Sequence, residues 1–276
     1  MAFEIDIKTG LDTIAAPGRS GLRGWLQPHR IVLIAVALAL VAAMALTMRW
    51  SWLPIYAGEL ALGLWRTVWM LVASVVLGFM LAVPLGLVQV TGPSLLAVPA
   101  RGFCTLIRGT PLLVQIWLLY YGVGSLFPLI PELRQSFLWP YLREAWPYGL
   151  LALSLSFAAY EGEVMRGGFA GVPRGELEAA RAYGMGPFTT LRRIWLPRAF
   201  YRALPTLGGE VVLQLKSTPL IATITVVDLY GVASRIREET FITYEPLLFL
   251  AFLYMCLSGI VVLLIRMLER RIPSGA

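Results

Sequence analysis

Six charged side chains interrupt stretches of this sequence that are otherwise apolar, and they are the residues best suited to hold a charged group. They are Arg108, Glu161, Glu163, Arg166, Glu210 and Lys216. A charge in an apolar segment is costly, so each of them needs a partner, a water-filled cavity or a position at a helix end. An enzyme inside a membrane would need a nucleophile, a base or metal ligands that converge on one point. These carboxylates do not form such a set.

The spacing of three of these residues predicts different surroundings for the two glutamates. Glu163 and Arg166 are three residues apart, so they share a helical face and can neutralise each other. Glu161 is two residues from Glu163 and points to another side of the helix, which leaves it without that partner. Two interpretations stay open for each glutamate. Glu163 is either half of an ion pair or a contact for a solute, and Glu161 is either a contact for a cationic group or a helix-end carboxylate wetted by water.

The elements that carry these charges read as membrane-spanning helices. The chain is 58% hydrophobic and only 14% charged, with a mean hydropathy of +0.73. Uncharged runs of about 18 residues or more are long enough to cross a bilayer, where only helices satisfy every backbone polar group of a single span. We predict an all-α polytopic membrane protein with six spans. They cover roughly residues 31–48, 64–89, 103–127, 147–166, 204–226 and 246–266.

The positive charges predict the orientation of these spans. With the N-terminus in the cytoplasm, 15 Lys and Arg residues fall on the inside and six on the outside, with Arg108 and Lys216 at membrane depth. This excess favours both termini inside. The net charge is +7, and the arginines behind it flank the apolar spans. No platform for stacking nucleic-acid bases accompanies them, so we expect anionic lipid and not nucleic acid as their partner. Cys104 and Cys256 lie in apolar helices, and no cluster of side chains has the spacing of metal ligands.

A basic segment between two predicted spans, residues 167–204, carries the most specific pattern. Its first part favours a helix and contains Glu178, Ala179, Ala180 and Arg181. Gly184 is suited to end that helix in a left-handed cap. Pro187 suits the first turn of a second short helix. The segment ends with Ile194, Leu196 and Pro197. An ordinary amphipathic loop is the simpler interpretation, but it does not explain the whole pattern.

That pattern resembles the EAA signature of the transmembrane subunits of bacterial ABC importers: EAA, three residues, Gly, nine residues, I-x-LP. The resemblance implies that the loop couples the membrane domain to a separate ATPase. It implies as partners two ABC ATPase subunits, a second permease subunit, identical or homologous, and a periplasmic substrate-binding protein. No cofactor is expected in this chain, because it has no GxxxxGK[ST] phosphate loop and ATP with Mg would lie on the partner.

A second block resembles the permeases for polar amino acids, the histidine, glutamine, arginine and opine group. It runs from Arg108 to Gln115 and reads RGTPLLVQ. The resemblance covers about residues 58–272 and implies a type I permease domain with five helices, to which this chain adds an extra helix at 31–50 after a tail at 1–30. It also implies import from periplasm to cytoplasm by alternating access, at the bacterial inner membrane. The predicted solute pathway consists of Arg108, Thr110, Gln115, Glu161, Glu163, Lys216, Ser217 and Thr218.

Two alternatives from other classes remain at this point. A secondary, ion-coupled carrier would also need charges within its spans, but the chain shows no internal repeat and carries the EAA loop. A membrane scaffold subunit would not need a charged, Pro-interrupted span. Which amino acid is carried, and whether the permease pairs with itself or with a sibling, the sequence leaves open.

Overall fold

The computed structural model describes residues 46–270, together with residues 32, 35, 36, 39 and 42. The chain divides into two units, Met1–Trp50 and Ser51–Ala276. The predicted tail at 1–30 lies outside the described residues, and so does half of the predicted extra helix at 31–50. The second unit is helical, with no strand among its described residues. This confirms the predicted all-α class.

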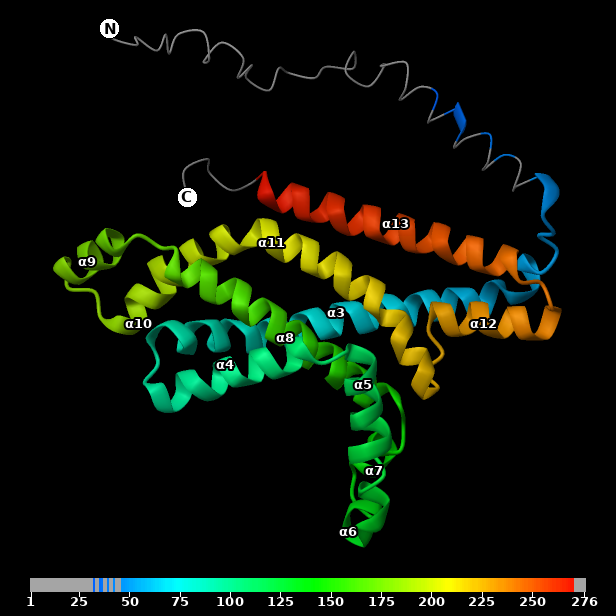
Figure 1. Cartoon of the computed structure of the whole chain (residues 1–276), viewed down its shortest axis with the longest axis horizontal. Helices are drawn as coiled ribbons and strands as arrows, with labels where there is room; N and C mark the ends of the chain where they lie inside the picture. The colour runs from blue at the N-terminus through cyan, green and yellow to red at the C-terminus, as the bar shows by residue number, and fades with distance from the viewer. Residues whose placement is uncertain (1–31, 33–34, 37–38, 40–41, 43–45, 271–276) are drawn as a thin grey trace, which may run out of the picture. The chain divides into compact units, whose positions relative to one another are not determined.

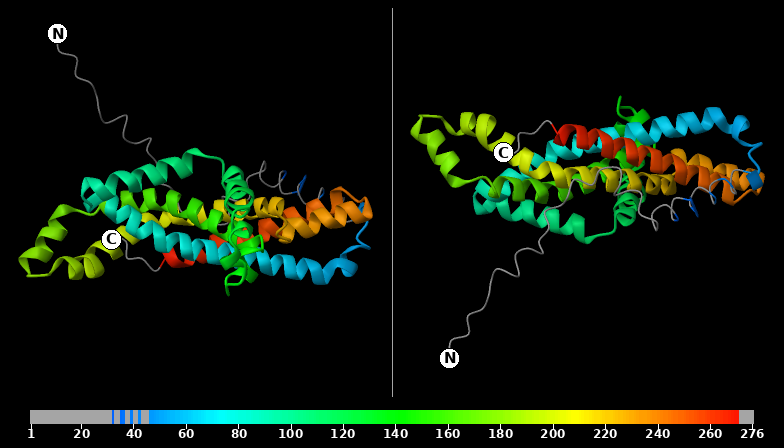
Figure 2. Two further views of the ribbon diagram at one scale, coloured as in Figure 1. Left: turned by 90° about the horizontal axis from the view of Figure 1, so that it is seen from below. Right: turned by 90° about the horizontal axis from the view of Figure 1, so that it is seen from above.

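Helix α8, Trp146–Ala170, is the central element of the second unit. It packs against α3 (Leu53–Thr91), α4 (Ser94–Gly109), α5 (Leu112–Trp117) and α11 (Leu196–Ser217). Helix α13, Tyr244–Glu269, lies against α11 on its other side (Figures 1 and 2). The predicted spans at 147–166 and 246–266 therefore correspond to α8 and α13, each extended by a few residues.

Helix α3 is one continuous helix of 39 residues, whereas the predicted span covered only 64–89. Pro54 lies in its first turn, where a missing N–H costs nothing. Its early residues are held by α12, Leu229–Thr240, through an ion pair between Arg235 Nη1 and Glu59 Oε2 at 3.1 Å. The Tyr56 hydroxyl also donates to Glu239 Oε2 at 2.8 Å. These contacts extend the helix beyond its most apolar part.

The predicted single span at 103–127 is wrong, because the chain breaks between α4 and α5. Thr110 has an extended backbone with φ −112° and ψ 141°. A residue before proline is disfavoured in a helix, and Pro111 has no N–H to continue the ladder. Helix α5 then leads into a π-helical turn, η2 (Leu118–Val123), a 3₁₀ turn, η3 (Phe127–Leu129), and the short helices α6 (Pro131–Arg134) and α7 (Trp139–Leu142). These elements extend to one side of the bundle (Figure 1).

The remaining elements also differ in detail from the predicted spans. The span at 204–226 is α11 followed by a 3₁₀ segment, η5 (Thr218–Ile224), and the chain then turns at Thr225 (φ 68°) into α12. Three helical stretches among the described residues are long and apolar enough to cross a membrane: Leu53–Thr91, Leu112–Leu129 and Tyr244–Glu269. A bent pair, Pro187–Ile224 with Leu229–Thr240, makes a fourth. Helix α8 is less apolar because it carries Glu161, Glu163 and Arg166.

Two apolar clusters hold the bundle together, one at each end of α8. The first joins residues such as Met70, Ile116, Leu153 and Ile221. The second joins Met165 and Phe169 to Ala199, Ala203 and Leu207 of α11. Helices α3 and α8 approach closely at Gly78, where a Cβ atom would lie 2.8 Å from the Ser154 carbonyl oxygen. Burial of apolar side chains at both ends fixes α8 between its neighbours.

Candidate functional site: the basic loop and the polar cavity

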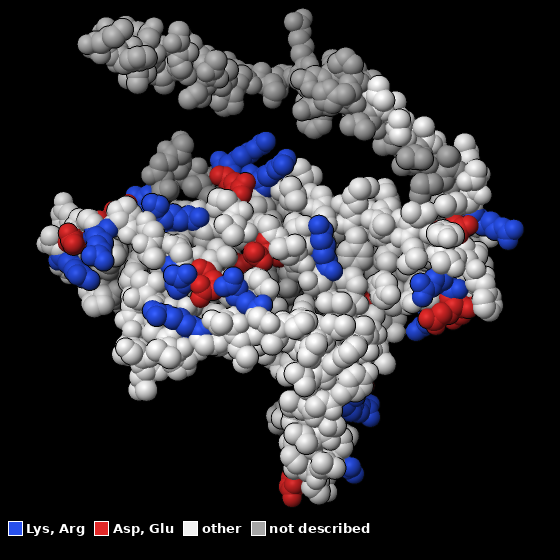
Figure 3. Space-filling view, viewed as in Figure 1, with Lys and Arg blue, Asp and Glu red and all other residues white. Residues whose placement is uncertain are grey.

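The basic loop forms two short helices at one end of the bundle, as its sequence predicts. Helix α9 spans Arg174–Ala182, and α10 spans Pro187–Thr190 with its proline in the first turn. Gly184 ends α9 with a left-handed backbone at φ 76°. Lys and Arg side chains gather over this end of the molecule (Figure 3). The short helices, the left-handed glycine and the position of Pro187 are therefore confirmed.

The residues of the EAA pattern occupy different surroundings. Ala180 is buried, while Glu178, Ala179 and Arg181 are exposed. Glu178 and Arg181 also line a cavity of about 450 Å³ beneath α9. Ala180 thus packs α9 against the rest of the loop and leaves its neighbours available to other groups.

The second half of the pattern connects the loop to the bundle. Ile194 lies in a π-helical turn, η4 (Leu191–Trp195), and Leu196 and Pro197 begin α11. Arg198 Nε contacts Glu176 Oε2 of α9 at 3.0 Å. Trp195 Nε1 donates to the Phe169 carbonyl oxygen of α8 at 3.0 Å. These contacts join α9 to the start of α11, and the η4 turn to the end of α8.

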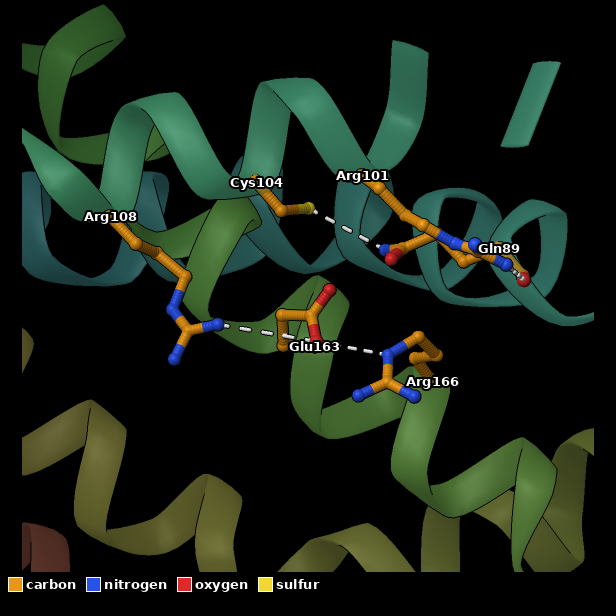
Figure 4. Close-up of polar contacts among 6 residues, drawn as sticks. All are labelled: Gln89, Arg101, Cys104, Arg108, Glu163 and Arg166. Carbon is orange, nitrogen blue, oxygen red and sulfur yellow. Dashed lines mark hydrogen bonds and ion pairs between the residues drawn. The ribbon is translucent and has the colours of Figure 1, made fainter. Parts of the chain in front are cut away.

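A charged cluster lies further along α8, where it faces α4 (Figure 4). Arg166 Nε contacts Glu163 Oε2 at 2.9 Å, which confirms the local pairing expected from their spacing. Arg108 Nη1 of α4 lies 4.0 Å from the same oxygen, and its guanidinium stacks over the Tyr160 ring at 5.3 Å. Two cations thus share one carboxylate. The cluster carries one net positive charge beside Tyr160.

Tyr160 also borders a cavity of about 190 Å³ between α8, α11 and the break at Thr110. Polar groups from all three sides reach it: Thr110, Ser156, Tyr160, Glu210, Gln214 and Ser217. Glu210 is partly exposed and has no ion-pair partner among the residues that the structure describes. The cavity therefore has a carboxylate on one wall and the stacked Arg108–Tyr160 pair near another.

Only part of the predicted pathway lines this cavity. Thr110 and Ser217 line it. Arg108 lies behind the wall, where it stacks on the wall residue Tyr160, and Glu163 contacts Arg108. Gln115 instead braces the break in the chain, because its Nε2 donates to the Ile107 carbonyl oxygen at 2.7 Å and to Thr110 Oγ1 at 2.9 Å.

Three further predicted residues lie away from the cavity walls. Lys216 is exposed. Thr218 is buried, and its hydroxyl forms hydrogen bonds with the Leu215 carbonyl oxygen and the Tyr254 hydroxyl. Glu161 is fully buried, and neither of its carboxyl oxygens has a hydrogen-bond partner among the described residues. A role for Glu161 in contacting a solute therefore requires a different conformation of the helices around it.

Sequence reasoning assigned no pathway role to Glu210, Tyr160 or Gln214. Gln214 Nε2 donates to Ser74 Oγ and to the Leu153 carbonyl oxygen, both at 3.0 Å, and so joins three helices beside the cavity. Glu210 gave a signal as a lone carboxylate in an apolar segment after Gly208 and Gly209. Spacing does not indicate the contacts of Tyr160 and Gln214, because their partners lie far away in the sequence.

Comparisons with known proteins agree with these arrangements. Residues 74–273 match the family described as binding-protein-dependent transport system inner membrane component. The octopine transport system permease protein of Rhizobium radiobacter is 43% identical over 72% of this chain and 79% of its own length. The histidine/lysine/arginine/ornithine transport system permease protein of Salmonella typhimurium is 38% identical over 74% of this chain and 86% of its own. A crystal structure of an amino acid ABC transporter with histidines matches 82% of this chain and 100% of its own, with a TM-score of 0.68 and 28% identity.

Proposed function

The chain belongs to the family of binding-protein-dependent transport system inner membrane components, and we propose that it carries a polar amino acid or an amino-acid derivative such as an opine. Its family makes it the permease subunit of an ATP-driven importer in the inner membrane, with no catalytic role of its own. The alternatives of an ion-coupled carrier and a scaffold are set aside on this ground. The class of solute rests on the octopine and histidine permeases that it resembles.

The observation that supports a coupled mechanism best is the pair of contacts between the loop and the bundle. Arg198 joins α9 to the start of α11, and Trp195 joins the loop to the end of α8. The same two helices supply Tyr160 and Glu210 to the polar cavity. Movement of α9 by an ATPase would therefore shift the walls of the cavity. In this mechanism Glu178, Arg181 and Gly184 form the contact with the ATPase, and Ile194, Leu196 and Pro197 connect it to α11.

The charges around the cavity suit the two ends of an amino acid. Arg108, stacked on Tyr160, would attract the carboxylate of the solute, and Glu210 would attract an ammonium or guanidinium group. Thr110 and Ser217 offer hydroxyl groups between them. Such opposed charges suit a solute that has a carboxylate at one end and a cationic side-chain group at the other, as arginine has.

The assembly that this function requires has several further members. Two ATPase subunits would hold ATP and Mg and dock on the loops of two permease subunits, identical or homologous. A periplasmic binding protein would deliver the solute to the outer ends of the helices, around α12. The loop of residues 167–204 and both termini would then be cytoplasmic, in agreement with the distribution of arginines.

Reconstitution tests this function. The permease is co-expressed with an ATPase and a binding protein from the same organism and placed in proteoliposomes. Uptake of labelled arginine, histidine and octopine is then followed with ATP inside the vesicles. We expect uptake of at least one of them to need ATP and the binding protein. Uptake that is driven by an ion gradient without ATP would refute the proposal.

A further inference from the structure

The cavity beneath α9 lies where two spans end. It is bordered by Val90 at the end of α3 and by Phe169 and Val172 at the end of α8, with α9 as its outer wall. Its volume is about 450 Å³. If the loop is cytoplasmic, as the proposed function requires, the cavity opens at the boundary between the hydrocarbon layer and the cytoplasm. An occupant from the membrane reaches it without leaving the interface.

The inner wall of this cavity is apolar and rigid. The rings of Phe169 and Trp195 meet edge to face with their centroids 5.6 Å apart. The indole N–H of Trp195 is already used by the Phe169 carbonyl oxygen, so the ring presents only its apolar surface to the cavity. Val90 of α3 completes this wall, and Leu177 of α9 faces the cavity from the opposite side. A hydrocarbon chain fits such a wall, whereas a small inorganic anion gains nothing from it.

The rim of the cavity is basic. Arg174 and Arg181 line it, both are exposed, and neither has an ion-pair partner among the described residues. The carboxylate of Glu176 in the same helix is already paired with Arg198. Glu178 is therefore the single acidic group on the rim, which keeps one net positive charge. Free guanidinium groups bind phosphate oxygens through paired hydrogen bonds.

From this combination we propose that the cavity binds an anionic phospholipid of the cytoplasmic leaflet, with its phosphate at Arg174 and an acyl chain against Trp195 and Val90. Basic pockets between spans on the cytoplasmic side are suited to such head groups. The lipid fills the space between α9 and the bundle, so that a push on α9 reaches α8 instead of collapsing the cavity. Coupling between the ATPase and the permease therefore depends on anionic lipid.

The test uses the intact permease–ATPase complex in nanodiscs of phosphatidylcholine alone or of phosphatidylcholine mixed with phosphatidylglycerol. Native mass spectrometry of the complex released from the mixed discs measures which lipid stays bound. We expect phosphatidylglycerol to be retained by the unaltered complex and to bind about fivefold more weakly after Arg174→Gln, the loss expected for one arginine near an anionic surface. Arg193→Gln, which removes an exposed arginine of the same loop outside the cavity, is the matched control and should leave retention unchanged.

Three outcomes would overturn the inference. Equal retention of phosphatidylcholine and phosphatidylglycerol would show that charge does not select the occupant. Displacement of the lipid by inorganic phosphate alone would show a free-anion site. Loss of the ATPase after Arg174→Gln in lipid-free detergent, with lipid retention unchanged, would show that the rim binds an acidic part of the ATPase instead. If no ATPase is present in the unaltered complex, the proposed function itself fails, and the two failures are thereby distinguished.

Discussion

At the scale of single residues, Gly184 has the clearest requirement. Its φ of 76° is left-handed, and a Cβ atom built on it meets nothing within 4 Å, so backbone conformation alone restricts the position. Asn tolerates this region, whereas a β-branched residue does not, and the left-handed conformation costs an ordinary residue about 1–2 kcal/mol. We expect Gly184→Val to leave the chain folded and inserted but to lower uptake per ATP hydrolysed, and Gly184→Asn to retain most of it. Equal loss in both variants would show that side-chain size, and not backbone conformation, matters there.

The two glutamates near the cavity lead to a second prediction. Glu210 lines the cavity, while Glu161 is fully buried. Glu210→Gln should therefore lower uptake of arginine about tenfold more than uptake of a neutral amino acid, because it removes the charge that faces a cationic side chain. Glu161→Gln should change both uptakes by a similar factor. The measurement is initial uptake of the two solutes in proteoliposomes, and a selective loss in the Glu161 variant would reverse the assignment.

Sequence spacing predicted those residue contacts that are local. The Glu163–Arg166 pair and the cap at Gly184 depend on neighbours within one turn, so the pattern of residues was enough. The role of Gln115 was not predicted, because its side chain turns back to the end of the preceding helix. Glu210 was recognised as a charge in a span, but its cavity exists only where α8 and α11 meet.

At the scale of elements, hydropathy predicted α8 and α13 to within a few residues. It did not show the break at Thr110, because an apolar average does not register that Pro111 lacks an N–H. It also made α3 too short, since the first turns of that helix are stabilised by an ion pair and a hydrogen bond with α12, and a hydropathy average does not include such contacts. Length and apolarity therefore locate a span, and its ends depend on tertiary contacts.

The close approach of α3 and α8 gives a prediction at this scale. A Cβ atom at Gly78 would lie 2.8 Å from both the Ser154 carbonyl oxygen and Phe157 Cδ1. Because one of these is backbone, Gly78→Leu should force the two helices apart at a cost of about 1–3 kcal/mol. We expect a lower melting temperature in detergent. Gly102→Leu, at a helical position where nothing lies within 4 Å, should melt like the unaltered protein, and equal melting of both variants would contradict the close packing.

At the scale of the whole molecule, the family assigns this chain to the membrane component of the transporter and ATP hydrolysis to a partner subunit. The sequence has no phosphate-binding loop, and among the described residues no cluster of side chains is suited to hold a metal ion. The contacts of Arg198 and Trp195 connect the loop to α11 and α8, the two helices that also border the polar cavity. Sequence motifs predicted the loop and its short helices, and its coupling to an ATPase stays a prediction.

Purification of the tagged chain from its native membrane tests this coupling, with mass spectrometry of whatever is recovered in stoichiometric amount. We expect an ATP-binding subunit to be recovered with the unaltered chain, and to be lost when Glu178 and Gly184 are both changed while the chain remains folded. A second permease of different sequence in the same sample would identify a heterodimer. Reproducible recovery of the folded chain without any ATPase, or an ATPase that remains bound when both residues are changed, would contradict the assignment of this loop.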